Sequence, residues 1–237
     1  MSKILEAMRR AEPESLDFGF KLATLDRAAL FPAPPREQMS EFEQLANALV
    51  ARHDGTTGRV VVFASTVSGE GTSYVSYNVA RHLSYMLDRK VAWVDANFHS
   101  PQGHLPAEGA TFKGMLQNPG LFPELKTAGN LVLVPHGDET IKPVDLLSGE
   151  NYLALLESFQ RNFFFTIIDA PPILDSVDVA HLAAPTLGLV LVIESRRLKH
   201  EIIRHGLETL VTQKVNVLGS VLNKRVFDIP GFLYRKL

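Results

Sequence analysis

Residues 60–74 read Val60-Val61-Val62-Phe63-Ala64-Ser65-Thr66-Val67-Ser68-Gly69-Glu70-Gly71-Thr72-Ser73-Tyr74. The stretch begins as a continuous apolar run and passes through small polar residues and two glycines. It then enters a segment whose apolar residues recur every three or four positions as far as Met86. This order predicts a buried strand, a tight loop and an amphipathic helix. Backbone N–H groups in such a loop converge on an anion, and the helix N-terminus adds a positive dipole, so the segment is typical of phosphate binding.

One residue of this pattern is missing. A complete P-loop ends in Gly-Lys followed by Ser or Thr, and its lysine reaches the β- and γ-phosphates. Here the end reads Gly71-Thr72-Ser73. Thr72 offers only a neutral hydrogen bond, whereas charge-assisted bonds to phosphate are about twice as strong. We therefore expect hydrolysis to suffer most, because catalysis of phosphoryl transfer depends on neutralising charge.

Length and composition narrow the possible functions. The 237 residues fit one large domain, or one domain with an appendage. The 24 basic and 26 acidic residues give no electrostatic case for nucleic-acid binding. Cysteine is absent, which excludes disulfides. The absence of cysteine is compatible with the cytoplasm. Because neither an apolar run of transmembrane length nor a secretory signal is present, we expect any link to a membrane to go through a partner.

The chain divides into two expected units. Residues 1–38 are predicted to form an N-terminal extension, with an amphipathic helix at 1–12 and a proline-containing linker that includes a helical piece at 15–29. The helix at 1–12 either docks on a partner or packs locally. Residues 39–237 are predicted to form a P-loop-like α/β domain.

The second unit alternates between apolar strands and amphipathic helices. It is predicted to open with a helix at 39–52, in which Ser40 is the N-cap and Glu43 completes a capping box. The predicted strands are 59–65, 91–96, 131–135, 164–169, 188–194 and 215–222. The further predicted helices are 73–88, 152–161, 176–184 and 200–213, with loop and short helix over 98–130. This alternation predicts a doubly wound α/β fold, whose mainly parallel sheet is flanked by helices and binds ligands at the carboxyl ends of its strands.

Two further candidate sites lie at predicted strand ends. Asp95 follows Val91–Val94, and Asp169 follows Phe164–Ile168. A carboxylate at this place suits a nucleotide-bound Mg²⁺, which prefers hard oxygen ligands. Each aspartate could instead cap a helix or bond to a loop.

The combined motifs resemble the cytoplasmic ATPase domain of bacterial tyrosine autokinases, the partners of polysaccharide co-polymerases in capsule and exopolysaccharide production. The resemblance covers about residues 40–226 and the N-terminus. It rests on residues 1–12, Ser65–Ser73, Val91–Pro101, Pro143–Leu147, Ile167–Pro172 with Asp178-Val179, and Leu218–Lys224. It implies a P-loop NTPase fold, ATP or ADP with Mg²⁺ as cofactor, and a membrane co-polymerase or other exopolysaccharide machinery as partner.

The resemblance also assigns roles to residues. The nucleotide-binding residues would be Gly69, Glu70, Gly71, Thr72, Ser73, Tyr74 and Asn223. The Mg²⁺ ligands would be Ser73, Asp95 and Asp169, and the two aspartates would be catalytic in an active enzyme. Tyr234 would be the phosphoacceptor. We expect Glu70 to face away from phosphate, Tyr74 to crowd the phosphate site, and Asn223 either to lie near the base or to end a turn.

Several departures from the family pattern fall at functional positions. Thr72 replaces the lysine of the family's loop. The second lysine that the related deviant P-loop carries is also absent, because Val67 takes its place. Asn97 stands where the family has its second acidic residue after the second strand. The arginines linked to ring assembly are missing from Ser40–Ala46, which predicts a monomer or small oligomer rather than a ring.

Three functions remain open from the sequence. The first is a degenerate, pseudokinase-like regulatory or scaffolding subunit of exopolysaccharide biosynthesis and export, with weak or no ATP hydrolysis. The second is an active ATP-dependent tyrosine kinase with a substitute cation, for which Arg196, Arg197 and Lys199 are candidates if they do not simply form a solvated loop. The third is a partitioning or positioning ATPase.

Overall fold

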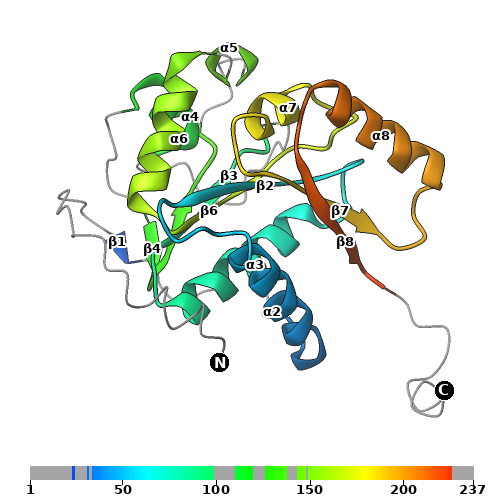
Figure 1. Cartoon of the computed structure of the whole chain (residues 1–237), viewed down its shortest axis with the longest axis horizontal. Coiled ribbons are helices and arrows are strands. Elements are labelled where there is room, and N and C mark those ends of the chain that lie inside the picture. The colour runs from blue at the N-terminus through cyan, green and yellow to red at the C-terminus, as the bar shows by residue number, and fades with distance from the viewer. Residues whose placement is uncertain are drawn as a thin grey trace.

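The computed structural model describes residues 23–24, 31, 34–98, 110–119, 126–137, 143–147 and 149–225. Its strands are β1 (Ala23–Thr24), β2 (Arg59–Ser65), β3 (Val91–Asp95), β4 (Lys126–Ala128), β5 (Leu131–Val134), β6 (Phe165–Asp169), β7 (Gly188–Glu194) and β8 (Val217–Asn223). Its helices are α2 (Arg36–Val50), α3 (Thr72–Leu87), α4 (Phe112–Gln117), α5 (Pro143–Leu147), α6 (Glu150–Asn162), α7 (Asp178–Ala183) and α8 (His200–Thr212). The strands form one sheet in the order β1-β4-β5-β3-β6-β2-β7-β8 (Figure 1).

The sheet is parallel except where β4 and β5 pair antiparallel. Helices cover both of its faces (Figure 1). The side chains of α2 and α3 pack with Phe63 and Trp93 on one face, and those of α4 to α8 form the core around Phe159 and Leu191 on the other. β2, β3 and β6 are apolar along almost their whole length because both of their faces are buried. The predicted doubly wound α/β fold is confirmed.

The start of the first described helix differs from the prediction. α2 begins at Arg36 behind Pro35, so Ser40 lies inside the helix and the predicted N-cap at Ser40 is wrong. Pro35 occupies the N-cap in an extended conformation, with φ −53° and ψ 149°. A proline fits this boundary because its fixed φ is compatible with a helix start.

The edge beyond β5 also differs. A helical piece was predicted at 15–29. This prediction is wrong for Ala23–Thr24, which form a short strand beside β4. β4 falls in a segment predicted as loop and short helix, and Gly129, with φ 66°, makes the turn into β5. These strands have two and three residues, too few for an alternating pattern to stand out.

Among the described residues, no helix is both long and apolar enough to cross a membrane. The helix predicted at 1–12 and the candidate phosphoacceptor Tyr234 lie outside those residues.

Candidate functional site

The three predicted sites meet at the carboxyl edge of the sheet. The loop Thr66–Gly71 joins β2 to α3, and β2 lies between β6 and β7. Asp95 and Asp169 end the adjacent strands β3 and β6, and they are direct partners in the strand register. The sheet order therefore brings Asp169 close to Asp95, 74 positions earlier in the sequence, and close to a loop that ends 98 positions earlier.

Both loop glycines have backbone conformations that other residues rarely adopt. Gly69 has φ 86°, and Gly71, the N-cap of α3, has φ 95°. A Cβ atom on Gly71 would lie 2.2 Å from Nδ2 of Asn223, and one on Gly69 would lie 2.9 Å from Nη1 of Arg197. The glycines therefore allow both the turn and the close approach of two later segments.

Glu70 is fully buried inside the loop. Its Oε2 accepts the backbone N–H of Thr66 at 2.8 Å and of Val67 at 3.0 Å, and its Oε1 accepts the N–H of Glu194 at 3.0 Å. The side chain is thus an internal anchor that ties the loop to itself and to the end of β7.

Two carbonyl groups of the loop accept hydrogen bonds from side chains that follow β7 and β8. Arg197 Nη2 donates to Ser68 O at 2.6 Å, and Lys224 Nζ donates to Gly69 O at 3.0 Å. Both cations also bond to the carboxylate of Glu194, at 3.0 and 3.1 Å. The hydrogen bond from Lys224 lowers the pKa of Glu194, and Arg197 acts in the same direction.

Asn223 completes these contacts, because its side chain donates to Glu70 O at 2.8 Å. The sequence named Asn223 as a nucleotide-binding residue and Arg197 as a possible substitute cation. It did not indicate that Glu194 and Lys224 contribute to the contacts of the loop. The available signal was their position, since Glu194 is the last residue of β7 and Lys224 directly follows β8.

The first turn of α3 contains Thr72, which replaces the missing lysine, and the residues that follow it. Thr72 is the first helical residue and is buried. The ring of Tyr74 packs edge-on against Phe31 and Phe42, with centroid distances of 6.2 and 6.1 Å. These contacts place it on the side of α3 that carries α2, so the expectation that Tyr74 crowds the phosphate site is wrong. The ring follows the apolar face of its helix.

Asp95 and Asp169 are both fully buried. Burial raises the pKa of Asp169 well above its usual range and the carboxylate of Asp95 raises it further, whereas the hydroxyls of Ser73 and Ser76 act in the opposite direction. Asp95 accepts the N–H of Asn97 at 3.1 Å. Among the described residues, neither oxygen of Asp169 receives a hydrogen bond of normal geometry.

Two buried carboxylates that repel one another fit a divalent cation between them. The described part of the chain has no group of three or more His, Asp or Glu side chains arranged to hold a metal. Asp95, Asp169 and the hydroxyl of Ser73 are the side chains that could hold Mg²⁺ here, and a bound ion would keep several waters. The sequence gave no signal for His136, whose buried Nδ1 lies 3.7 Å from Oδ2 of Asp95.

The comparisons with curated proteins point in one direction. No model of a protein family matches the chain. Tyrosine-protein kinase CpsD of Streptococcus agalactiae is 27% identical over 197 residues, which cover 79% of this chain and 85% of CpsD. Putative tyrosine-protein kinase EpsB of Ralstonia nicotianae is 26% identical over 223 residues, 88% of this chain and 29% of EpsB. Succinoglycan biosynthesis transport protein ExoP of Rhizobium meliloti is 25% identical over 181 residues, 72% of this chain and 23% of ExoP.

Solved structures share the fold. The chimerical protein CapA2B2 aligns with a TM-score of 0.70 at 20% identity, covering 87% of this chain and 94% of its own. The kinase domain of the Escherichia coli tyrosine kinase ETK aligns with a TM-score of 0.70 at 20% identity, covering 81% and 79%. McdA of Cyanothece aligns less well, with a TM-score of 0.55 at 17% identity over 70% of each chain. The homologues of this chain are therefore bacterial tyrosine-protein kinases, and its fold is that of their kinase domains.

Proposed function

We propose that this protein is a degenerate relative of the tyrosine kinases that acts as a regulatory or scaffolding subunit of bacterial exopolysaccharide or capsule biosynthesis and export. It hydrolyses ATP weakly or not at all. It works in the cytoplasm as a monomer or small oligomer and docks on a membrane polysaccharide co-polymerase. The similarity to CpsD, EpsB and ExoP supports the pathway.

The observation that carries this proposal is how the loop is held. Thr72 supplies no positive charge, and the loop keeps its shape through contacts within the chain. The carboxylate of Glu70 accepts hydrogen bonds from two N–H groups of the loop. Arg197 and Lys224 donate hydrogen bonds to two of the loop's carbonyl groups. A loop built in this way keeps the fold intact without the charge that phosphoryl transfer requires.

A complementation experiment tests the proposal. The gene is deleted in its host, and polysaccharide yield is measured after the wild-type chain or Asp169→Asn is restored. A scaffold predicts equal yields, because under this proposal Asp169 would serve a bound Mg²⁺ rather than the shape of the protein. A yield that falls to the deletion level with a folded Asp169→Asn protein contradicts the proposal.

The active-kinase alternative keeps one supporting observation. Arg197 and Lys224 already lie at the loop, where each donates to a carbonyl oxygen, and both are cations of the kind that bind phosphate. Mass spectrometry of the protein incubated with ATP and Mg²⁺ decides between the two, since an active kinase phosphorylates Tyr234. The partitioning alternative is weaker, because systems of that kind cycle by hydrolysis and both loop lysines are absent.

A further inference from the structure

The outer edge of β8 has no strand beside it in the described part of the chain. β8 is the last strand of the sheet and pairs only with β7. Its seven residues make it as long as β2 and β7, the longest strands described. An exposed strand of this length offers a row of backbone donors and acceptors to another chain.

The hydrogen-bond register shows which backbone groups of β8 point away from β7. Ser195 N donates to Asn223 O at 2.9 Å, so Asn223 faces β7, and Val221 faces β7 two positions earlier. Ser220 and Leu222 lie between these positions, and their N–H and C=O groups therefore point to the outer edge. The carbonyl of Leu218 accepts a side-chain bond from Arg52 at 3.3 Å, which marks where the open edge begins.

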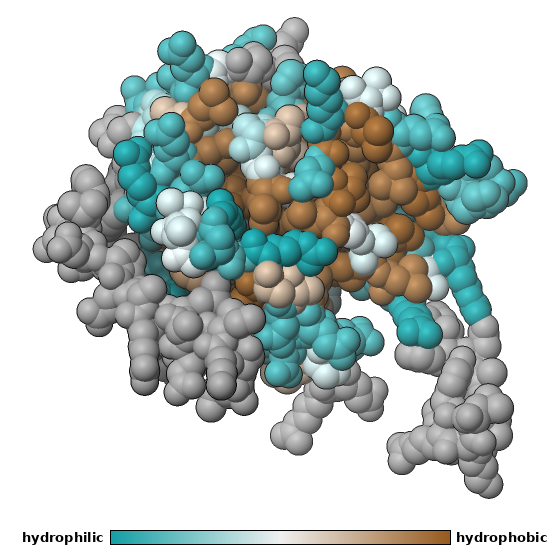
Figure 2. Space-filling view, viewed as in Figure 1, coloured by the Kyte–Doolittle hydropathy of each residue, from teal (hydrophilic) through white to brown (hydrophobic). Residues whose placement is uncertain are grey.

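Hydrophobic side chains surround this edge. Figure 2 shows a continuous hydrophobic area over β8 and the adjoining parts of α7 and α8. Leu222 is 52% exposed and Ile202 is 38% exposed. A patch of this kind on a soluble domain marks an interaction site.

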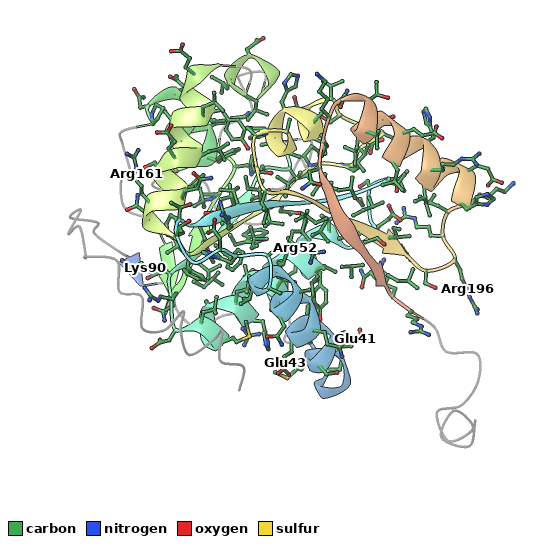
Figure 3. All side chains as sticks on the ribbon, viewed as in Figure 1. Glu41, Glu43, Arg52, Lys90, Arg161 and Arg196 are labelled. Atoms are coloured by element: carbon green, nitrogen blue, oxygen red, sulfur yellow. The ribbon has the colours of Figure 1, made fainter. Side chains whose placement is uncertain are left out.

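Cations outnumber carboxylates at this edge. The exposed cations at the ends of β7, β8 and α2 are Arg52, Arg196, Arg197, Lys199, Lys224 and Arg225. The carboxylates in these segments are Glu194, which bonds to two of these cations, Glu201, and Asp54, which pairs with Arg59. Figure 3 shows Arg52 at the end of α2 beside the sheet and Arg196 at the rim beyond β7, whereas Glu41 and Glu43 lie toward the other end of α2.

This charge decides between possible occupants. A second copy would bring the same cations to the same edge, and like charges directly opposed are destabilising. The residues beyond Arg225 contain Arg235 and Lys236 against one acidic residue, Asp228, so this segment has no complementary charge. An acidic segment of a partner protein satisfies both the charge and the open backbone.

We propose that the outer edge of β8 is a docking site for an extended, acidic segment of a partner protein, which adds a strand to the sheet and places alternate apolar side chains against Leu222 and Ile202. Backbone bonds to Ser220 and Leu222 supply the register, and the cations select an acidic sequence. The proposal does not depend on nucleotide binding, so it stands or falls separately from the function proposed for the loop.

A fluorescent octapeptide of alternating glutamate and valine is the test probe, and one of alternating lysine and valine is its control. Both are titrated with the full chain, and binding is measured by fluorescence anisotropy. Ser220→Pro removes one outward N–H and no bond to β7, since a proline is tolerated on an edge strand. Ser220→Ala keeps that N–H. The pair Arg52→Glu with Arg225→Glu reverses the charge at the edge, and Lys90→Glu with Arg161→Glu makes the same change on the far side of the molecule (Figure 3).

The expected result is that the acidic peptide binds at least about tenfold more tightly than the basic one, and that Ser220→Pro and the Arg52/Arg225 pair each weaken it about tenfold. Ser220→Ala and the Lys90/Arg161 pair leave binding within about twofold. Hydrogen exchange of the Ser220 and Leu222 amides slows when the acidic peptide is bound. Equal binding of both peptides, or unchanged binding by Ser220→Pro, overturns the proposal.

Two further outcomes would assign the edge to another occupant and so overturn it. If a chain that ends at Arg225 binds the acidic peptide at least about tenfold more tightly, the protein's own last residues cover the edge. If light scattering shows a dimer that Ser220→Pro abolishes, a second copy of the chain covers the edge.

Discussion

Glu70→Gln tests whether one buried carboxylate holds the loop. The three N–H groups that Glu70 accepts come from Thr66, Val67 and Glu194. Glutamine has the same size but only one acceptor oxygen. If that oxygen takes the place of Oε2, the amide NH₂ faces the N–H of Glu194, and two donors then oppose each other.

The structure sets the size of the effect. A buried N–H left without a partner costs about 1–3 kcal/mol, and two charge-assisted bonds that become neutral lose about 1 kcal/mol each. Removing a buried charge returns part of this cost. We therefore expect the free energy of unfolding to fall by about 3 kcal/mol, which lowers the urea midpoint by about 1.5 M for a slope near 2 kcal/mol per M.

The assay is equilibrium unfolding in urea, followed by circular dichroism. Glu157→Gln on α6 is the matched control, because its side chain is 71% exposed and its ion pair with Arg161 is long, at 3.9 Å. The control is expected to change stability by less than about 0.5 kcal/mol. A change below about 1 kcal/mol in Glu70→Gln would refute the reasoning that the loop depends on this anchor.

Three other variants follow from the same structure. Asp169 has a raised pKa in the folded protein, so the stability it contributes is complete below the ordinary carboxyl pKa of 3.8 and is lost as pH rises through the folded-state pKa. Asp169→Asn should therefore melt higher than wild type at pH 7.5 in calorimetry without Mg²⁺, with the difference shrinking toward pH 4. Gly71→Ala should lower the melting temperature by at least about 4 °C, because φ is 95° and the new Cβ meets Asn223. Tyr152→Phe should cost about 1–3 kcal/mol in urea unfolding, because its buried hydroxyl donates to a carbonyl of α7 at 2.7 Å.

Much of the fold could be predicted because its central strands carry a strong signal. β2 and β7 match the predicted ranges 59–65 and 188–194, and the predicted helix at 200–213 differs from α8 by one residue. These segments are long enough for periodicity to show. β1 and β4 were missed because they are held by pairing rather than by a pattern of their own.

The candidate site could be predicted in part. Asp95, Asp169 and Asn223 each stand at a strand end, so the sequence placed them at one edge of the sheet. The network around Glu194 could not be foreseen, because it depends on side chains that reach across the sheet edge over more than 100 residues of sequence. Tyr74 was misjudged because a position beside the loop in sequence does not fix which face of α3 a ring takes.

The central claim is that a P-loop fold has lost phosphate affinity at one position. Calorimetric titration of the purified protein with ADP or ATP and Mg²⁺, beside Thr72→Lys, tests it most directly. Thr212→Lys, which places the same charge at an exposed threonine at the end of α8, is the control. The account predicts binding in the micromolar range, about −8 kcal/mol, by Thr72→Lys, and binding by wild type and the control that is at least about tenfold weaker or not measurable. Micromolar binding by the wild-type protein would contradict it, and would indicate that another cation replaces the lysine.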